Sequence, residues 1–152
     1  MLFWRIVKPV YAAKPLSGEG AARWGSRWSS PGFAVVYAAS SRALAVLEML
    51  VHVKREFIPR EAVLLPLEVP EHLIVELPKL PEGWNSFPYR SDVRQVGDRW
   101  VEQRASLAIF VPSAVLPAER NILINPAHTE STQIRPGEPE PHAFDPRLFG
   151  IR

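Results

Sequence analysis

Alternating apolar and polar positions recur along the chain and predict a fold built mainly from short β-strands. Strands are expected at residues 2–7, 33–40, 61–70, 73–77, 107–113 and 121–126. Residues 41–53 and 91–104 repeat apolar side chains at helical spacing, with Ser40 or Ser41 as the cap of the first helix. Residues 14–25 are expected to form a loop that includes one helical turn. Because these strands do not alternate regularly with helices, the pattern predicts an α+β fold and not a doubly wound sheet.

Proline is the unusual feature of the composition, with 16 of 152 residues, against a usual share of roughly 5%. Each proline removes a backbone donor, which favours short strands joined by loops over long helices. Residues 1–152 are expected to form a single domain, because this length is sufficient for one hydrophobic core. The proline-rich segment 130–152 is expected to pack on the body through Phe144, Leu148 and Phe149.

Charge and cysteine content narrow the classes of function. The formal net charge is +2, and lysine and arginine are scattered, whereas a nucleic-acid binder usually has a dense basic stripe. No direct contact with nucleic acid is therefore expected. Cysteine is absent, which excludes disulfides and a thiol nucleophile. No apolar run is long enough to span a bilayer, so a cytoplasmic protein without membrane contact is expected.

Common catalytic and cofactor motifs are missing. The chain contains neither of the common glycine-rich phosphate-binding motifs, GxxxxGK[ST] and GxGxxG. It also lacks the GxSxG nucleophile elbow of α/β-hydrolases. Its four histidines are widely separated and show no metal-ligand spacing. No metal and no bound cofactor are therefore expected.

Glu48 is the most informative single residue, because it lies among leucines and valines. It follows Leu44 by four residues and precedes Val51 by three, which places it on or beside the apolar stripe of its helix. Its carboxylate lies either at the edge of that stripe, in water, or in a cleft. In a cleft it could stabilise the positive charge that develops when a glycosidic C–N bond breaks. An arginine that binds pyrophosphate and a tyrosine that packs on the leaving ring would complete a site for a dinucleotide such as NAD.

Residues 25–50, "GSRWSSPGFAVVYAASSRALAVLEML", resemble the core signature of the RES domain, the toxin of RES–Xre toxin–antitoxin systems. The positions that match the family's arginine, tyrosine, glutamate and serine are Arg27, Tyr37, Glu48 and Ser113. "NILINP" and "FDPRLF" resemble the closing pattern of the family. Ser29 stands where asparagine is expected after the Arg–Trp pair.

The resemblance implies an ADP-ribosyltransferase-like fold with a short-stranded split sheet and a few helices. It implies NAD as the substrate, cleaved at the nicotinamide–ribose bond, which depletes cellular NAD and arrests growth. Arg27 would hold the phosphates or ribose, Tyr37 would stack near the nicotinamide, and Glu48 would stabilise the cationic ribose. Ser113 would support the substrate or Glu48 by hydrogen bonding, and Ser29 would contact the substrate.

Two further substrate contacts are suggested by position in the strands. Arg5 alternates with apolar neighbours on its strand, so its guanidinium is either partly buried or reaches into a cleft as a second phosphate contact. Asn125 precedes Pro126 at a strand end, where a turn role is an equal alternative.

The resemblance also implies a partner, an Xre-type helix-turn-helix antitoxin that covers the active site, and a homodimer is expected within that complex. Three alternatives stay open: phosphorolysis of NAD, transfer of ADP-ribose to a protein or nucleotide, and a non-catalytic binding module in which Arg27, Tyr37 and Glu48 only pack.

Overall fold

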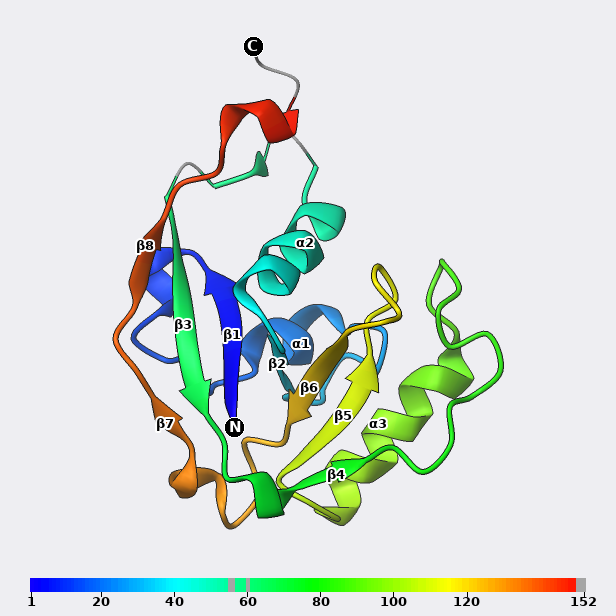
Figure 1. The fold of residues 1–152 in the computed structure, drawn as a ribbon. Coiled ribbons are helices and arrows are strands. Elements are labelled where there is room, and N and C mark those ends of the chain that lie inside the picture. The colour runs from blue at the N-terminus through cyan, green and yellow to red at the C-terminus, as the bar shows by residue number, and fades with distance from the viewer. Residues whose placement is uncertain (55–56, 60, 150–152) are drawn as a thin grey trace.

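The strands of the protein join in one mixed sheet, seen in a computed structural model that describes residues 1–54, 57–59 and 61–149 (Figure 1). The strand order is β4-β5-β6-β2-β1-β3-β7, and β8 pairs with β3 beside β7. β4 and β5 run parallel and the other pairs run antiparallel. With three α-helices on this sheet, the expected α+β class is confirmed.

Every strand and helix expected from the sequence is present, with shifted ends. The strands are β1 Leu2–Val7, β2 Val36–Ala39, β3 Ala62–Glu68, β4 Ile74–Glu76, β5 Ala108–Pro112, β6 Arg120–Ile124, β7 Arg135–Pro136 and β8 Glu140–His142. The α-helices are α1 Glu19–Trp24, α2 Arg42–His52 and α3 Ser91–Gln103. Short 3-10 turns occur at Pro9–Tyr11, Glu71–Leu73, Ser131–Gln133 and Pro146–Phe149. The predicted single helical turn is the six-residue α1.

The sheet is split between β1 and β2, as the resemblance implied. β1 pairs with β3 over six residues, and β2 pairs with β6 over four. β1 and β2, in contrast, share only the pair Trp4↔Ala39. The two halves of the sheet therefore diverge at this junction and leave room between them.

α2 lies over this junction (Figure 1). Ser41 caps the helix by accepting a hydrogen bond from the Leu44 backbone amide at 3.1 Å. Leu44 and Ala45 are buried against Trp4, Ala39 and Leu64 of the sheet. Val51, which the helical spacing placed on the apolar stripe, is exposed.

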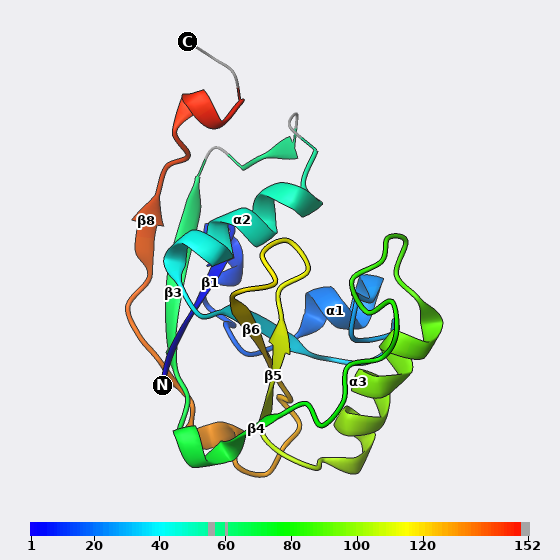
Figure 2. The ribbon, with the colours of Figure 1, turned by 45° about the vertical axis from the view of Figure 1, so that its right-hand side comes forward.

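α3 packs on the other half of the sheet, and the turned view in Figure 2 separates it clearly from α2. Val93 and Trp100 are buried against Ile109 and Leu123. Gly97 faces the carbonyl of Trp28, and an added Cβ would lie only 1.7 Å from that oxygen. α3 thus contacts the backbone of the loop that carries Arg27.

The C-terminal segment lies along β3 through two short strands. β8 pairs with residues 62–64 and β7 with Leu67 and Glu68. Pro66 lies between the stretches of β3 that pair with β8 and with β7, and its carbonyl accepts from the Gly137 amide at 2.9 Å. Residues 135–142 therefore lie along β3, whereas Leu148, one of the three side chains expected to dock this segment, is exposed.

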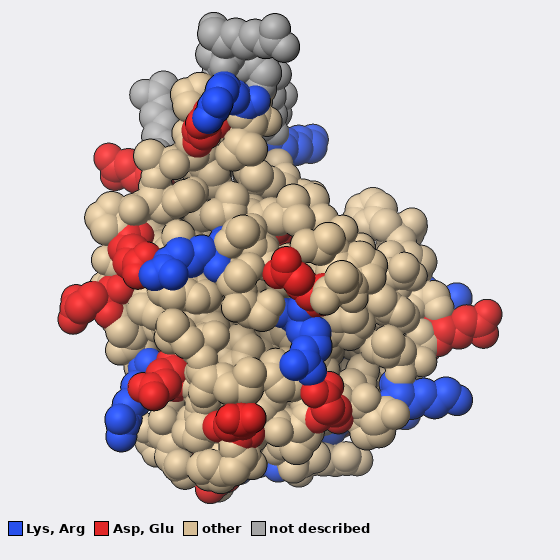
Figure 3. All heavy atoms as spheres, in the orientation of Figure 1, with Lys and Arg blue, Asp and Glu red and all other residues tan. Residues whose placement is uncertain are grey.

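Charged side chains of both signs are interspersed on the face shown in Figure 3, without a continuous basic stripe there. Within the described part of the chain, no helix has the length and apolar character that a bilayer crossing requires.

Candidate active site

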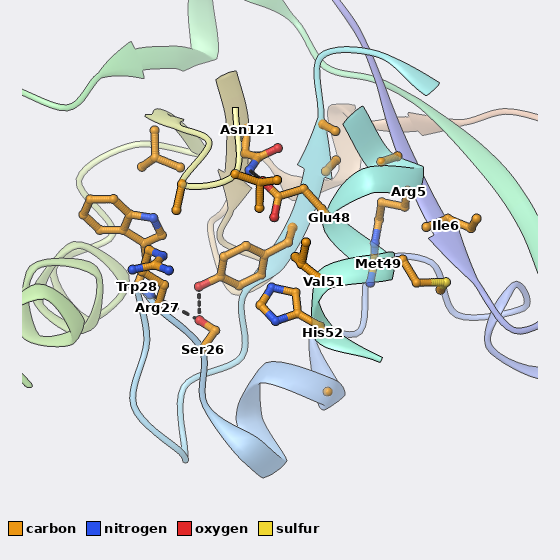
Figure 4. Close-up of a pocket in the computed structure, with 18 of the residues that line it drawn as sticks. Arg5, Ile6, Ser26, Arg27, Trp28, Glu48, Met49, Val51, His52 and Asn121 are labelled. Atoms are coloured by element: carbon orange, nitrogen blue, oxygen red, sulfur yellow. Dashed lines mark hydrogen bonds between the residues drawn. The ribbon is translucent and has the colours of Figure 1, made fainter. Parts of the chain in front are cut away.

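A cavity of about 770 Å³ lies over the junction where the sheet splits. Its walls come from β1, β2, α2, the end of α1, the loop 25–28, the loop 85–89, and β5 and β6 with the loop after β5. Arg27, Tyr37 and Glu48, the first and last of which are 21 residues apart in sequence, all line it. In Figure 4, Arg27 and Glu48 approach the same space from opposite sides. Its volume lies within the range of roughly 300–1,000 Å³ typical of small-molecule sites.

The Glu48 carboxylate is held by two neutral donors. Ser113 Oγ donates to Glu48 Oε1 at 2.7 Å, and Asn121 Nδ2 donates to the same oxygen at 2.6 Å. Ser113 Oγ in turn accepts from the backbone amides of Val115 and Leu116, at 3.2 and 3.0 Å. Both hydrogen bonds that the described residues give this carboxylate end on Oε1. The geometry therefore fixes the side chain through Oε1, and no hydrogen bond from the described residues ends on Oε2; Figure 4 shows the side chain beside Asn121.

The Arg27 guanidinium is tied to the loop opposite α2. Nη1 donates to the carbonyls of Trp84 and Ser86, both at 2.8 Å. The guanidinium carbon lies 4.8 Å from the centre of the Tyr89 ring. Because guanidinium carries five N–H donors in one plane, donors remain for an anionic ligand.

The Tyr37 hydroxyl is enclosed by two serines. It hydrogen bonds with Ser26 Oγ and lies 3.3 Å from Ser29 Oγ. Burial raises the pKa of Tyr37 to about 12, because water no longer stabilises the phenolate. At neutral pH this side chain is therefore an uncharged ring with a fixed hydroxyl, and it does not act as a base.

This shift predicts a pH dependence of stability. The folded-state pKa lies above the unfolded value of 10.0, so the contribution of Tyr37 is fully present below pH 10 and is lost as the pH rises toward 12. We compare the free energy of unfolding of the native protein with that of Tyr37→Phe. The difference, native minus variant, is expected to fall by about 1 kcal/mol between pH 9 and pH 11. Urea unfolding of both proteins measures this difference, in which the titration of all other groups cancels. A flat difference over this range contradicts the assignment.

Arg5 also lines the cavity, from β1. Its Nη1 donates to the carbonyl of Pro15, and burial lowers its pKa to about 10. Because the pKa remains well above 7, the side chain is a cation at neutral pH. The structure thus brings Arg5 to the same cavity as Arg27.

Ser29, Ser113 and Asn125 are fully buried and are not among the residues that line the cavity. Ser29 supports Tyr37, and Ser113 supports Glu48. Asn125 lies at the opposite end of β6 from Asn121, where it donates to the Val101 carbonyl at 3.2 Å and accepts from the Ala127 amide. The geometry gives Asn125 the structural turn role that the sequence left open, and it gives no support to a substrate contact.

The cavity residues that were not selected from the sequence include Asn121, Tyr89 and His52. Asn121 and Asn125 point to the same face of β6 by strand alternation, so periodicity could not tell which end of the strand meets Glu48. Tyr89 comes from the loop 80–89 and His52 from the end of α2. The one feature of the sequence that could have indicated Asn121 as a site residue is its position as a polar residue at the start of an otherwise apolar strand.

The described residues contain no group of three or more histidine, cysteine, aspartate or glutamate side chains that could hold a metal ion. What the cavity offers is a fixed carboxylate, two guanidiniums and aromatic surfaces. This set is suited to an anionic ligand with a flat ring, and to a reaction in which positive charge develops beside Glu48.

The chain is similar to known proteins of one family. The family model described as "RES domain" matches residues 2–145. The chain is 39% identical to the Prs ADP-ribosylating toxin of Sphingobium sp., over 97% of this chain and 96% of the relative. It is 36% identical to Toxin Res of Yersinia enterocolitica, over 97% and 99% of the two chains. A crystal structure of the M. tuberculosis MbcT-MbcA toxin-antitoxin complex has the same fold, with a TM-score of 0.73, 19% identity and coverage of 98% of this chain and 86% of that one.

Proposed function

This chain belongs to the RES domain family, and on that basis we propose that it is the toxin of a toxin–antitoxin pair and acts by cleaving NAD at the nicotinamide–ribose bond. The observation that carries the proposal is the Glu48 carboxylate, fixed by Ser113 and Asn121 in a cavity that it shares with Arg27 and Tyr37. Relatives named as toxins support the first part, and the geometry supports the second.

In the proposed reaction, the bond between ribose C1′ and the nicotinamide nitrogen breaks with both electrons going to that nitrogen. The nitrogen is positively charged in NAD, so nicotinamide leaves as a neutral molecule and needs no proton from the protein. The ribose is left as an oxocarbenium-like cation. The free Oε2 of Glu48 stabilises this cation, and a carboxylate that is already oriented does so without further reorganisation.

Arg27 and Arg5 provide positive charge for the two phosphates. The Nη1 of Arg27 is engaged by two carbonyls, so its other nitrogens would face the ligand. Tyr37, neutral and rigid, gives the leaving ring a flat surface. Ser29 and Ser113 act behind these side chains as supports.

The acceptor of ADP-ribose is water in the primary proposal. Transfer to a protein is the second candidate, because a relative 39% identical to this chain is named an ADP-ribosylating toxin. Phosphorolysis is a third outcome of the same chemistry, in which phosphate attacks C1′.

The test is incubation of the purified protein with NAD labelled in its adenylate half. We expect release of nicotinamide, with free ADP-ribose for hydrolysis, ADP-ribose phosphate for phosphorolysis when phosphate is added, or a labelled macromolecule for transfer when cell extract is added. Absence of nicotinamide release under all three conditions contradicts the proposal and favours a non-catalytic binding module.

The proposed partner is an Xre-type helix-turn-helix antitoxin, and the proposed setting is the cytoplasm, where NAD is available. The interspersed charges on the face in Figure 3 fit a toxin that leaves contact with DNA to its partner. Expression of the chain alone is expected to stop growth and lower cellular NAD, and co-expression of the antitoxin is expected to prevent both.

A further inference from the structure

Tyr89 lies between charged groups on the loop opposite α2. Its ring centre is 4.8 Å from the Arg27 guanidinium carbon and 5.5 Å from that of Arg94. Its hydroxyl lies 3.2 Å from Nδ1 of His52, at the C-terminal end of α2. We propose that Tyr89, anchored by His52, is a positioning residue that holds the Arg27 guanidinium in the orientation that binds the phosphates of the substrate.

Arg27 needs such support because its backbone lies in a loop between α1 and β2. Two carbonyls accept from Nη1, whereas no hydrogen bond among the described residues holds Nε or Nη2. A ring packed against the guanidinium restrains these remaining nitrogens, and the attraction between cation and π-face adds to the contact. Tyr89 therefore determines where the remaining N–H donors of Arg27 point.

Arg94 supports the same arrangement from α3. Its Nε donates to the Ser26 carbonyl at 2.8 Å, next to Arg27 in sequence, while its guanidinium also lies near the Tyr89 ring. The ring thus lies near two cations whose positions are separately fixed by backbone carbonyls.

His52 completes the contact from the other wall. In Figure 4 it projects from α2 into the cavity, on the side of Ser26 and Arg27. Its bond to Tyr89 joins α2, which carries Glu48, to the loop that holds Arg27. The pair therefore couples the position of the acid to that of the phosphate-binding arginine.

The charged groups around Tyr89 are consistent with a position between Arg27 and Glu48. Burial raises the pKa of Tyr89, the Arg27 and Arg94 guanidiniums lower it, and the Glu48 carboxylate raises it. The hydroxyl thus lies within the fields of both Arg27 and Glu48.

The inference rests on the proposed function, since it assigns Arg27 to the phosphates of NAD. Phosphate contacts far from the breaking bond contribute to binding of substrate and transition state alike, so their loss raises KM and leaves kcat nearly unchanged. A purely structural role of Tyr89 would instead lower the melting temperature and the amount of active protein, without this division between KM and kcat.

The experiment compares Tyr89→Leu, Tyr89→Phe and a control, Tyr11→Leu, by NAD turnover and by calorimetric titration with ADP-ribose. Tyr11 is an exposed tyrosine that does not line the cavity. Tyr89→Leu is expected to raise KM for NAD and Kd for ADP-ribose roughly threefold to thirtyfold, with kcat within about threefold of the native value. Tyr89→Phe keeps the ring and should lose only roughly twofold to fivefold, and Tyr11→Leu should change neither constant.

His52→Ala tests the anchor. It is expected to match Tyr89→Phe, and the double variant His52→Ala/Tyr89→Phe should be no worse than either single one, because all three lack the same hydrogen bond. Additive effects in the double variant, or an unchanged KM in Tyr89→Leu, overturn the inference.

The outcomes separate the inference from the proposed function. A native protein that turns over NAD, with Tyr89→Leu unchanged, overturns only the role of Tyr89. A native protein that binds ADP-ribose without cleaving NAD, with binding weakened in Tyr89→Leu, overturns the reaction and supports the role of Tyr89. A native protein that neither binds ADP-ribose nor cleaves NAD overturns both.

Discussion

Glu48→Gln is expected to reduce kcat for NAD cleavage by about 10²- to 10³-fold, the usual cost of removing one oriented group that stabilises transition-state charge. The side chain keeps its shape, and Oε1 can still accept from Ser113 and Asn121 as it does in the native protein. What disappears is the negative charge beside the developing ribose cation. The measurement is initial-rate release of nicotinamide at saturating NAD.

The control for Glu48→Gln is Glu102→Gln. Glu102 is an exposed carboxylate on α3 that does not line the cavity, so the same chemical change there should leave both kcat and the melting temperature unchanged. The role of Glu48 is refuted if Glu48→Gln unfolds at the native temperature and retains a third or more of the native kcat. A loss of activity that is accompanied by loss of fold would assign Glu48 to stability instead.

Gly97→Ala is expected to lower the free energy of unfolding by about 3 kcal/mol, an effect typical of a group forced into a filled interior. An alanine Cβ at this position would lie 1.7 Å from the Trp28 carbonyl oxygen and 2.8 Å from its carbonyl carbon. These atoms belong to the backbone and cannot rotate away, so α3 and the loop after α1 must separate. Urea unfolding followed by tryptophan fluorescence measures the change.

Gly20→Ala is the matched control, because it makes the same substitution in α1, where nothing lies within 4 Å of the added Cβ. Replacing glycine by alanine inside a helix usually stabilises by ~0.5–1 kcal/mol, so the two variants should shift in opposite directions. Arg27 directly precedes Trp28, and Gly97→Ala should therefore also weaken ADP-ribose binding in the protein that remains folded. Equal stability of Gly97→Ala and the native protein would rule out the close contact between α3 and this loop.

Local patterns were sufficient for most of the secondary structure. Alternation of apolar residues identified β1 to β6, and helical spacing with Ser41 as cap identified α2. These features depend on side chains a few residues apart, which is why the sequence shows them. The short strands β7 and β8 were missed, because they extend over two and three residues in a proline-rich segment and form by pairing with β3.

The candidate site was predicted in part, through the resemblance to the RES domain. It pointed to Arg27, Tyr37 and Glu48, which line one cavity, and to Ser29 and Ser113, which lie behind them. Position in the strands suggested two more residues. Arg5 does reach the cavity, whereas Asn125 is engaged at the far end of β6.

The sequence by itself determined where β1 to β6, α2 and α3 lie, and it determined that Glu48 lies beside an apolar stripe, since both follow from interactions between residues a few positions apart. Only the tertiary structure decided what that carboxylate meets: Ser113 is 65 residues away and Asn121 is 73. It also decided that the Trp28 carbonyl packs directly against Gly97 and that the Tyr89 ring packs against the Arg27 guanidinium. The physical reason is that these contacts depend on how the two halves of the sheet diverge at Trp4 and Ala39 and on how the helices pack across them, and no local pattern encodes that geometry.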